Sequence, residues 1–262
     1  MSMVKVTILA DNKVIALRPQ GLKAEWGFSA LIEAKDVVLF DAGQTGVAFD
    51  NFQLLDLPRP KVMVLSHGHY DHTGGMRRFT GMVERIYAHP DAFLPRFYKG
   101  EYVGIPFRRE SLGVEVVEHR EPVEVAKGVW ALGEIPRKYE TALLKDSYIL
   151  RDGRRERDEI LDDQSLAIKT DSGILLVLGC CHSGLRNTIE WAEEVVGDEV
   201  RFVIGGTHLI AYKPEEVREI VSKLDLELMA PCHCTGIRME FLLMDLLGER
   251  FKMVGSGSVV EV

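Results

Sequence analysis

Several short apolar segments of this sequence run directly into a turn that carries a histidine, and this repeated pattern restricts the fold more than any other feature. Segments of this length predict buried strands, and the stretches that follow them predict helices. The segments and their histidines are Lys61–Leu65 with His67, Ile174–Leu178 with His182, Arg201–Ile204 with His208 and Leu226–Ala230 with His233. A chain that alternates strands and helices in this way predicts a layered α/β fold, in which loops at the strand ends converge on a site.

The rest of the chain extends this pattern. Further strands are expected at Val4–Ala10, Phe28–Glu33, Val37–Phe40, Arg85–Ala88, Val114–Glu118, Val129–Leu132 and Ser258–Val262, and helices at Thr45–Leu55, from Thr73 to Phe79, from Ser183, from Pro214 and at Phe241–Leu247. Strands and helices mixed in two similar halves predict two sheets packed face to face with helices outside. No linker rich in proline, glycine or serine divides the chain, so we expect a single domain over residues 1–262.

Composition limits the classes of partner. The 262 residues carry a formal net charge of -8, which gives no sign of a nucleic-acid partner. No apolar run is long enough to cross a membrane and the N-terminus lacks a signal-peptide pattern, so we expect a cytoplasmic protein without membrane contact. The four cysteines fall in two tight pairs, Cys180 with Cys181 and Cys232 with Cys234, and in that compartment free thiols are expected.

Residues 91–163 are less regular than the rest of the chain. Aromatic and basic side chains are frequent there, and the charged run Arg151–Asp163 has no periodic pattern. The simplest interpretation of this run is a solvated loop. The alternative is a mobile lid or insertion over the site, because functional loops are commonly held out from a rigid scaffold.

Three histidines and an aspartate within six residues predict a metal centre. His67 and His69 lie two apart on extended chain and therefore project to the same side. Asp71 and His72 follow after the chain turns, so they can face a second ion. Imidazole and carboxylate ligands suit zinc, manganese or iron, and a site of this kind with open coordination positions is typical of catalysis.

The segment Ser66–Gly75 resembles the His-x-His-x-Asp-His signature of the metallo-β-lactamase superfamily, and the resemblance extends over nearly the whole chain. It implies an α/β fold of that type, a four-layer αββα sandwich, with two divalent metal ions. Leu39–Gly43 is similar to the superfamily's earlier strand-then-aspartate element, in which Asp41 would orient a ligand histidine. His233 matches the final ligand histidine.

Further stretches resemble one branch of the superfamily, the 7,8-dihydropterin-6-methyl-4-(β-D-ribofuranosyl)aminobenzene-5′-phosphate synthases of methanopterin biosynthesis and their hydrolase-like relatives. They are His67–Gly75, Gly133–Arg137, Asp162–Leu166, Gly179–Gly184, Gly205–Leu209 and Pro231–Gly236. Together and in this order they are specific for the family. They say less about the reaction, because members of one fold differ in substrate.

The sequence departs from the superfamily at two ligand positions. Where most members carry a metal-bridging aspartate after a strand, this chain has Cys180, with His182 two residues later, and where many have a Gly-His loop it has Glu134. One resolution is that His182 becomes a ligand while water or Glu134 bridges the ions. The other is that Cys180 ligates as a thiolate. We favour His182 as the ligand and Cys180 as a packing residue.

The expected metal ligands are therefore His67, His69, Asp71, His72, His182 and His233. Asp71 and His208 are the candidate catalytic residues, although a core role for His208 is equally consistent with the sequence. Asp163 is a candidate for binding a polar ring, against a plain acidic loop, and Arg137 for holding a phosphate, against an ordinary surface position. His89 and His119 match no motif and are left outside the site.

The resemblance implies an enzyme that uses two divalent ions on a small phosphorylated or pterin-like substrate. One form is a dihydropterin-methyl transferase that releases diphosphate, and the alternative is a hydrolase that uses a metal-bound hydroxide on a phosphoester or lactone. Zinc is the first expectation, with manganese, iron and magnesium as alternatives. A nuclease ranks lower because no basic track is visible, and a non-catalytic metal sensor ranks third; a homo-oligomer stays open.

Overall fold

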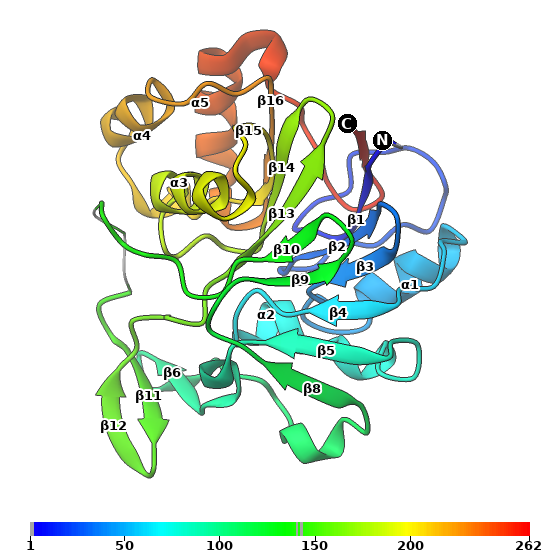
Figure 1. The fold of residues 1–262 in the computed structure, drawn as a ribbon, viewed down its shortest axis with the longest axis vertical. Helices are drawn as coiled ribbons and strands as arrows, with labels where there is room; N and C mark the ends of the chain where they lie inside the picture. The colour runs from blue at the N-terminus through cyan, green and yellow to red at the C-terminus, as the bar shows by residue number, and fades with distance from the viewer. Residues whose placement is uncertain (1–2, 140, 142–143) are drawn as a thin grey trace.

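Two β-sheets face each other at the centre of the molecule. The computed structural model describes residues 3–139, 141 and 144–262. Within them, one sheet has the strand order β17-β1-β2-β3-β4-β5-β8 and the other the order β16-β15-β14-β13-β10-β9 (Figure 1). The first contains β1 (Lys5–Ala10), β2 (Ser29–Glu33), β3 (Val37–Phe40), β4 (Val62–Val64), β5 (Arg85–Ala88), β8 (Glu115–Glu118) and β17 (Val259–Glu261). The second contains β9 (Val123–Ala126), β10 (Val129–Ala131), β13 (Ser165–Thr170), β14 (Gly173–Leu178), β15 (Val200–Gly206) and β16 (Leu228–Cys232).

Buried side chains divide the molecule into four layers. One apolar cluster joins the two sheets and includes Ile8, Phe40, Leu175 and Ile204. A second cluster packs the outer face of the second sheet against α3 (Leu185–Val196), α4 (Pro214–Val221) and α5 (Ile237–Leu247). A third packs the outer face of the first sheet against α1 (Val47–Leu54). Figure 1 shows α3, α4 and α5 on one side of the two sheets and α1 on the other, so the expected four-layer αββα sandwich is confirmed.

Helix α3 shows how the pattern creates a layer. Leu185, Ile189 and Ala192 are spaced three and four apart, so they share one face and are buried against the sheet. Burying a leucine or isoleucine side chain stabilises the fold by about 1.5–3 kcal/mol. The helix ends where Gly197 takes a left-handed conformation with φ of 73°.

Parallel strands bring the polar turns of both sheets together. β3, β4 and β5 run parallel in the first sheet, and β14, β15 and β16 run parallel in the second. The carboxyl ends of neighbouring parallel strands lie at one edge of a sheet. The turns that carry the predicted site histidines all follow such strands.

The helix expected from Thr73 to Phe79 is wrong in its position. The structure has a short helix, α2 (Tyr70–Thr73), and then a 3-10 turn at Met76–Arg78. Gly74 separates them, and a Cβ atom there would lie 2.0 Å from the carbonyl oxygen of Gln44. The chain must pass this close to its neighbour, so a continuous helix with larger side chains does not fit.

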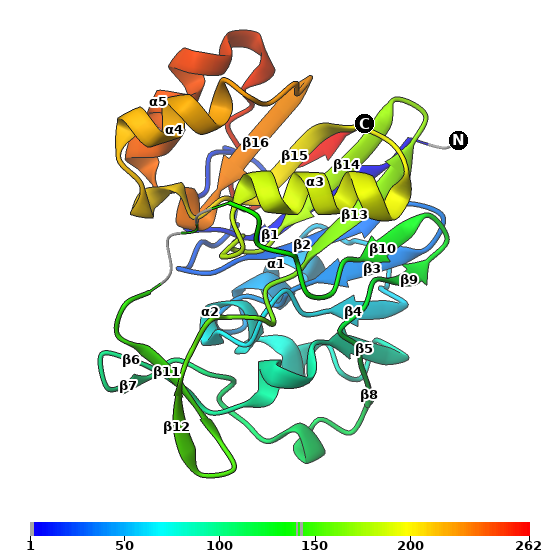
Figure 2. The same cartoon turned by 60° about the vertical axis from the view of Figure 1, so that its left-hand side comes forward.

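Residues 91–163 supply a third, smaller sheet that the sequence did not predict. Its strand order is β12-β11-β6-β7, with β6 (Arg96–Tyr98), β7 (Glu101–Tyr102), β11 (Ser147–Arg151) and β12 (Arg154–Arg157), and it lies at the lower end of Figures 1 and 2. The charged run is thus an exposed hairpin rather than a loop, and its last part is buried at Asp158, Asp162 and Asp163. Residues 140, 142 and 143 of the predicted lid segment lie outside the described residues, and the lid role stays a prediction.

Short 3-10 turns complete the described structure, at Pro90–Phe93, Arg109–Ser111, Leu209–Ala211, His233–Thr235 and Gly248–Arg250. Among the residues that the structure describes, none of the helices combines the length and apolar character needed to cross a membrane.

Candidate metal centre

Three histidine side chains from two strand ends form the first triad. His67 and His69 follow β4, and His182 follows β14. His67 Nε2 lies 2.7 Å from His69 Nδ1, and one ring nitrogen of His182 lies within 4.8 Å of both. All three side chains are buried. The first triad is thus three imidazoles turned toward one point from two sheets.

The ring of His182 is the best indication of what the first triad holds. Neither Nδ1 nor Nε2 has a hydrogen-bond partner among the described residues, although both are buried. An unpaired buried polar atom costs about 1–3 kcal/mol. Burial lowers the pKa of His67, His69 and His182 well below its usual value, so these rings are neutral, the form that ligates a metal. The donor set and the unpaired ring both fit a divalent ion.

A second triad of Asp71, His72 and His233 lies beside the first. Asp71 and His72 sit on α2, and His233 follows β16. His72 Nε2 lies 3.1 Å from His233 Nε2, and His233 Nε2 lies 3.6 Å from Asp71 Oδ2. One carboxylate and two imidazoles suit zinc, manganese or iron.

Asp41, which directly follows β3, contacts His72 of the second triad and, through Ser66, His67 of the first triad. Its Oδ2 lies 2.6 Å from His72 Nδ1 and also accepts a hydrogen bond of 2.6 Å from Ser66 Oγ. Ser66 Oγ lies 2.9 Å from Nδ1 of His67. Burial lowers the pKa of His72, but the carboxylates of Asp41 and Asp71 overcome this effect and raise it to about 9. A carboxylate on the far nitrogen fixes ring orientation and increases ligand basicity.

His233 is held by two residues that the sequence analysis missed. Its backbone N–H donates to Asp11 Oδ1 at 2.7 Å, and its Nδ1 lies 3.2 Å from Asn12 Oδ1. Asp11 and Asn12 directly follow the buried strand β1. A polar pair after a strand was the available signal, because the other site residues occupy equivalent positions.

Trp26 is a further residue that sequence reasoning did not identify. Its ring lies 5.6 Å from that of His233, and the side chain remains 51% exposed. A hydrogen bond from Trp26 reaches Asp71, whose pKa is raised by burial. The indole therefore presents an aromatic surface to solvent next to the second triad.

The consecutive residues Asp162, Asp163 and Gln164 tie the metal-binding turns together. Asp162 Oδ2 accepts from Gly68 N at 2.8 Å, and Asp163 Oδ2 accepts from Ser183 N at 2.8 Å. The Gln164 backbone N–H donates to the Ser66 carbonyl at 2.9 Å, and its side-chain amide donates to the Leu65 carbonyl at 3.0 Å. Asp163 was a candidate for substrate binding, and in the structure it is fully buried against the turn of His182.

Arg96 balances the charge of Asp162. Its Nη2 donates to Asp162 Oδ1 at 2.8 Å, and both side chains are about 1% exposed. Arg96 belongs to β6. The small third sheet is thereby connected through one buried ion pair to the backbone between His67 and His69.

Cys180 lies among the predicted ligands. Its Sγ is 3.3 Å from His72 Nε2 and 3.5 Å from His233 Nε2, and it also forms a group with His67. Gly179 allows this approach, because a Cβ atom there would lie 2.3 Å from Ser66 Oγ. The thiolate alternative is therefore available geometrically; the packing role stays a prediction.

Glu134 does not join either triad. Its carboxylate contacts His89 Nε2 at 2.8 Å and the guanidinium of Arg120. His89 and Arg120 both lower the pKa of Glu134 against the opposing effect of its burial. This pairing argues against Glu134 as the bridge between two ions.

His208 lies beside His182, and Arg137 acts electrostatically on Asp163. Arg137 Nη2 donates to the Ile160 carbonyl at 2.9 Å, while its buried Nε has no partner among the described atoms. The ring of His208 lies 4.3 Å from that of His182. Burial lowers the pKa of His208, but Cys234 and Asp163 raise it overall.

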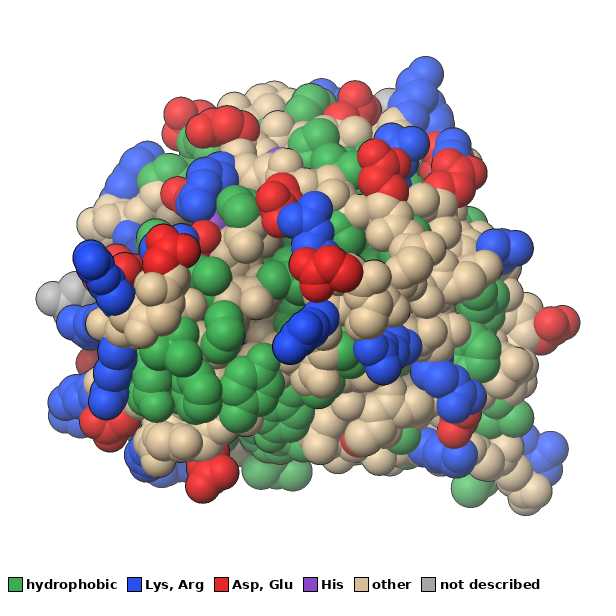
Figure 3. Space-filling view, turned by 90° about the horizontal axis from the view of Figure 1, so that it is seen from below, with side chains coloured by type: hydrophobic (Ala, Val, Ile, Leu, Met, Phe, Trp, Pro, Cys, Tyr) green, Lys and Arg blue, Asp and Glu red, His purple; other side chains and the backbone are tan. Residues whose placement is uncertain are grey.

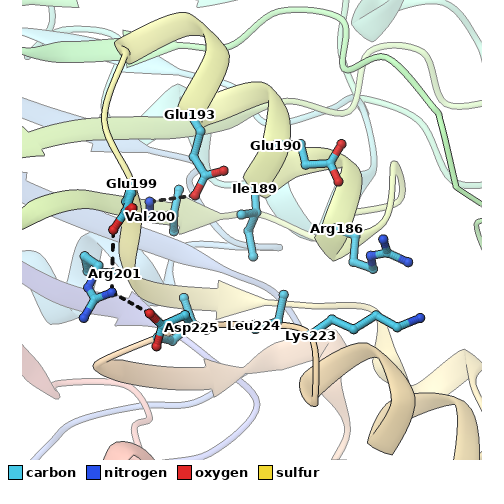
Figure 4. Close-up of a pocket in the computed structure, with 11 residues that line it drawn as sticks. Arg186, Ile189, Glu190, Glu193, Glu199, Val200, Arg201, Lys223, Leu224 and Asp225 are labelled. Atoms are coloured by element: carbon cyan, nitrogen blue, oxygen red, sulfur yellow. Dashed lines mark hydrogen bonds and ion pairs between the residues drawn. The ribbon is translucent and has the colours of Figure 1, made fainter.

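A surface hollow at α3 is lined by none of the predicted site residues. It has a volume of about 330 Å³ and is lined by α3 and by the segments around Val200 and Leu224 (Figure 4). Glu193 accepts from Val200 N at 3.0 Å, and Arg201 pairs with Asp225 at 2.9 Å. The hollow has the character of a charged surface groove and lacks a cluster of metal ligands.

Comparison with known proteins agrees with this geometry. The model of the metallo-β-lactamase superfamily matches residues 27–153. The protein MJ0448 of Methanocaldococcus jannaschii is 33% identical over 89% of this chain and 91% of its own length. The 7,8-dihydropterin-6-methyl-4-(β-D-ribofuranosyl)-aminobenzene-5′-phosphate synthase of the same organism is 30% identical over 91% of this chain and 90% of its own length.

A solved structure extends the similarity to the whole fold. The crystal structure of Tm1679, described as a metal-dependent hydrolase of the β-lactamase superfamily, has a TM-score of 0.87 and 28% identity over 99% of both chains. Sequence, fold and the two triads agree on one assignment. This chain belongs to the metallo-β-lactamase superfamily.

Proposed function

We propose that this protein is an enzyme that holds two divalent metal ions and acts on a small phosphorylated or pterin-like molecule. The observation that carries the proposal is the pair of adjacent triads, His67/His69/His182 and Asp71/His72/His233, whose ligand atoms converge from both sheets. When bound, two such ions polarise a phosphoryl or carbonyl oxygen and lower the pKa of water toward neutrality. Zinc is the proposed ion, with manganese, iron and magnesium as alternatives.

The residues around the triads have separate tasks in this proposal. Asp41 holds the His72 ring through Nδ1, so Nε2 points into the centre. Asn12 holds the His233 ring through Nδ1, and Asp11 holds the His233 backbone N–H. The Trp26 surface, half exposed beside the second triad, suits stacking of a flat heteroaromatic ring. Arg137, with an unpaired Nε, supplies positive charge for a phosphate group.

The synthase relative supports a transferase as the first form of the reaction. An electron-rich aromatic carbon would attack the methylene carbon of a dihydropterin, and the carbon–oxygen bond to diphosphate would break. The arene then loses one proton, for which Asp71 and His208 are the candidate acceptors. The departing diphosphate would need positive charge, for which Arg137 is the candidate side chain.

Tm1679 supports a hydrolase as the alternative form. Water would then replace the aromatic carbon as nucleophile, with a phosphoester or lactone as substrate. Both forms require the same triads. A small-molecule substrate is favoured over a nucleic acid by the net charge of -8 and by the mixture of acidic and basic side chains on the face shown in Figure 3.

A substrate panel on zinc-loaded protein tests the proposal. It contains a dihydropterin diphosphate with an aryl acceptor, phosphodiesters, nucleotides and lactones, and structured RNA and DNA. We expect turnover of a small molecule that chelation abolishes and that added zinc restores. Cleavage of nucleic acid without small-molecule turnover, or turnover that survives complete metal removal, would contradict the proposal.

A further inference from the structure

We propose that Cys180, His208 and Cys234 form a third cation position beside the two triads, one that is rich in sulfur and selects a thiophilic divalent ion such as zinc. This third position goes beyond the proposed function, which needs only the first and second triads. The sulfur atoms of Cys180 and Cys234 and one ring nitrogen of His208 all lie within 4.8 Å of one another. We call these three residues the thiol site.

Three separate strand ends bring the thiol site together. Cys180 follows β14, His208 follows β15 and Cys234 lies in the turn after β16. These three strands are neighbours and run parallel. Adjacent parallel strands therefore deliver one ligand each to the same edge of the second sheet.

Gly206 leaves room for the Cys234 thiol to lie close to the backbone of β15. A Cβ atom on Gly206 would lie 2.7 Å from Cys234 Sγ, so any larger residue there would push the thiol away. His208 adopts a left-handed backbone with φ of 52°, which among residues other than glycine is favoured by asparagine, aspartate and histidine. This turn directs the His208 ring toward His182 and the thiol site.

The surroundings of the two sulfur atoms are polar rather than apolar. The backbone N–H of His208 donates to Cys234 Sγ at 3.3 Å. Cys180 Sγ faces the ring nitrogens of His72 and His233. The buried Nδ1 of His208 lacks a hydrogen-bond partner in the described part of the chain, so the ring is not fully engaged by protein groups.

The other two cysteines provide the contrast. Cys232 packs in the apolar cluster between the sheets, and Cys181 packs under the outer helices with Thr188 Oγ1 at 3.4 Å from its Sγ. Neither contributes to a group of metal-ligating atoms in the described structure. Zinc binds thiolate sulfur at about 2.3 Å and imidazole nitrogen at about 2.0–2.1 Å, so three atoms spaced as in the thiol site can surround it. Soft sulfur ligands favour zinc over magnesium or manganese.

Titration of metal-free protein with cobalt(II), a spectroscopic substitute for zinc, tests the proposal. We expect wild-type protein to bind three ions and to develop a sulfur-to-cobalt charge-transfer band in the near ultraviolet. Cys234→Ala should bind two ions with a weakened band. His208→Asn, which suits the left-handed backbone, should weaken cobalt binding at the third position by at least about tenfold. Cys232→Ala is the matched control and should behave as wild type.

Circular dichroism and thermal melting of each variant separate ligand loss from unfolding. Wild type that binds two ions without the band, or Cys234→Ala that keeps three ions and the full band, would overturn the thiol site. In the first case two ions remain bound and in the second case three, so the proposed function stands in both. Wild type that takes up no ion at all would overturn the two together.

Discussion

Asp41 illustrates how much of the centre depends on single buried side chains. Its carboxylate contacts His72 Nδ1 and Ser66 Oγ at 2.6 Å each, and Ser66 in turn contacts His67. One residue therefore orients a ring in each triad. The resemblance of Leu39–Gly43 to the superfamily's strand-then-aspartate element made Asp41 predictable. Asp11 and Asn12, which hold the backbone N–H and the ring of His233, matched no motif.

Replacing Asp41 by asparagine removes the charge but preserves the shape. We expect Asp41→Asn to weaken zinc binding at the second triad about 10–100-fold, the usual cost of losing an outer carboxylate partner. Isothermal titration calorimetry of metal-free protein measures the change. Asp36→Asn is the control, since the Asp36 carboxylate forms an exposed pair with Lys61. Equal affinities for the two variants would contradict the role given to Asp41.

His182 tests the first triad directly. Because both of its ring nitrogens are buried without partners, His182→Ala removes a ligand without breaking a hydrogen bond in the described structure. We expect one fewer tightly bound zinc ion per chain by elemental analysis, and little loss of folding stability. His119→Ala, outside both triads, should keep the wild-type zinc content. A full complement of zinc in His182→Ala would mean that this histidine has only a structural role.

At the scale of elements, the strand ends were predictable, but the way in which Asp162–Gln164 connects them was not. Apolar runs followed by histidine turns indicated β4, β14, β15 and β16, because burial dictates their composition. The segment Asp162–Gln164 resembles a charged surface loop in sequence, yet its side chains are buried against three turns. Its partners lie about 20 to nearly 100 residues away, and pairings at that separation leave no local periodicity.

The Arg96–Asp162 pair connects β6 to the turn of His67 and His69. Asp162→Ala leaves the buried Arg96 charge with only the longer contact to Asp158 Oδ2 at 3.6 Å, so we expect a loss of up to about 3–5 kcal/mol in the free energy of unfolding. Adding Arg96→Met should recover part of this loss. Urea denaturation measures both variants. Asp225→Ala, which breaks an exposed pair with Arg201, should change stability by at most about 1 kcal/mol. A similarly small effect of Asp162→Ala would contradict the stabilising role given to the Arg96–Asp162 pair.

Gly74 lies between α2 and the following 3-10 turn. A Cβ atom there would lie 2.0 Å from the Gln44 carbonyl oxygen, so Gly74→Ala should destabilise the protein by about 1–3 kcal/mol or more. Gly81 has open space around it and serves as the control, with Gly81→Ala expected to be nearly neutral. Thermal melting compares the two. Equal melting temperatures for the two variants would contradict the close contact between position 74 and the Gln44 carbonyl.

At the scale of the whole molecule, alternating strands and helices were enough to predict two packed sheets with helices outside. The clusters between and outside the sheets have the apolar spacing on which that prediction depended. The third sheet could not be predicted from the sequence, because β12 is exposed throughout and β7 has only two residues. Neither strand therefore shows the alternation of a half-buried strand.

The central claim is that both sheets together hold two metal ions. A crystal structure of zinc-loaded protein, with anomalous scattering recorded on both sides of the zinc absorption edge, tests it most directly. We expect one zinc peak bound by His67, His69 and His182 and another bound by Asp71, His72 and His233. Zinc peaks that are absent from both triads, or a single peak bound by neither complete set, would contradict it.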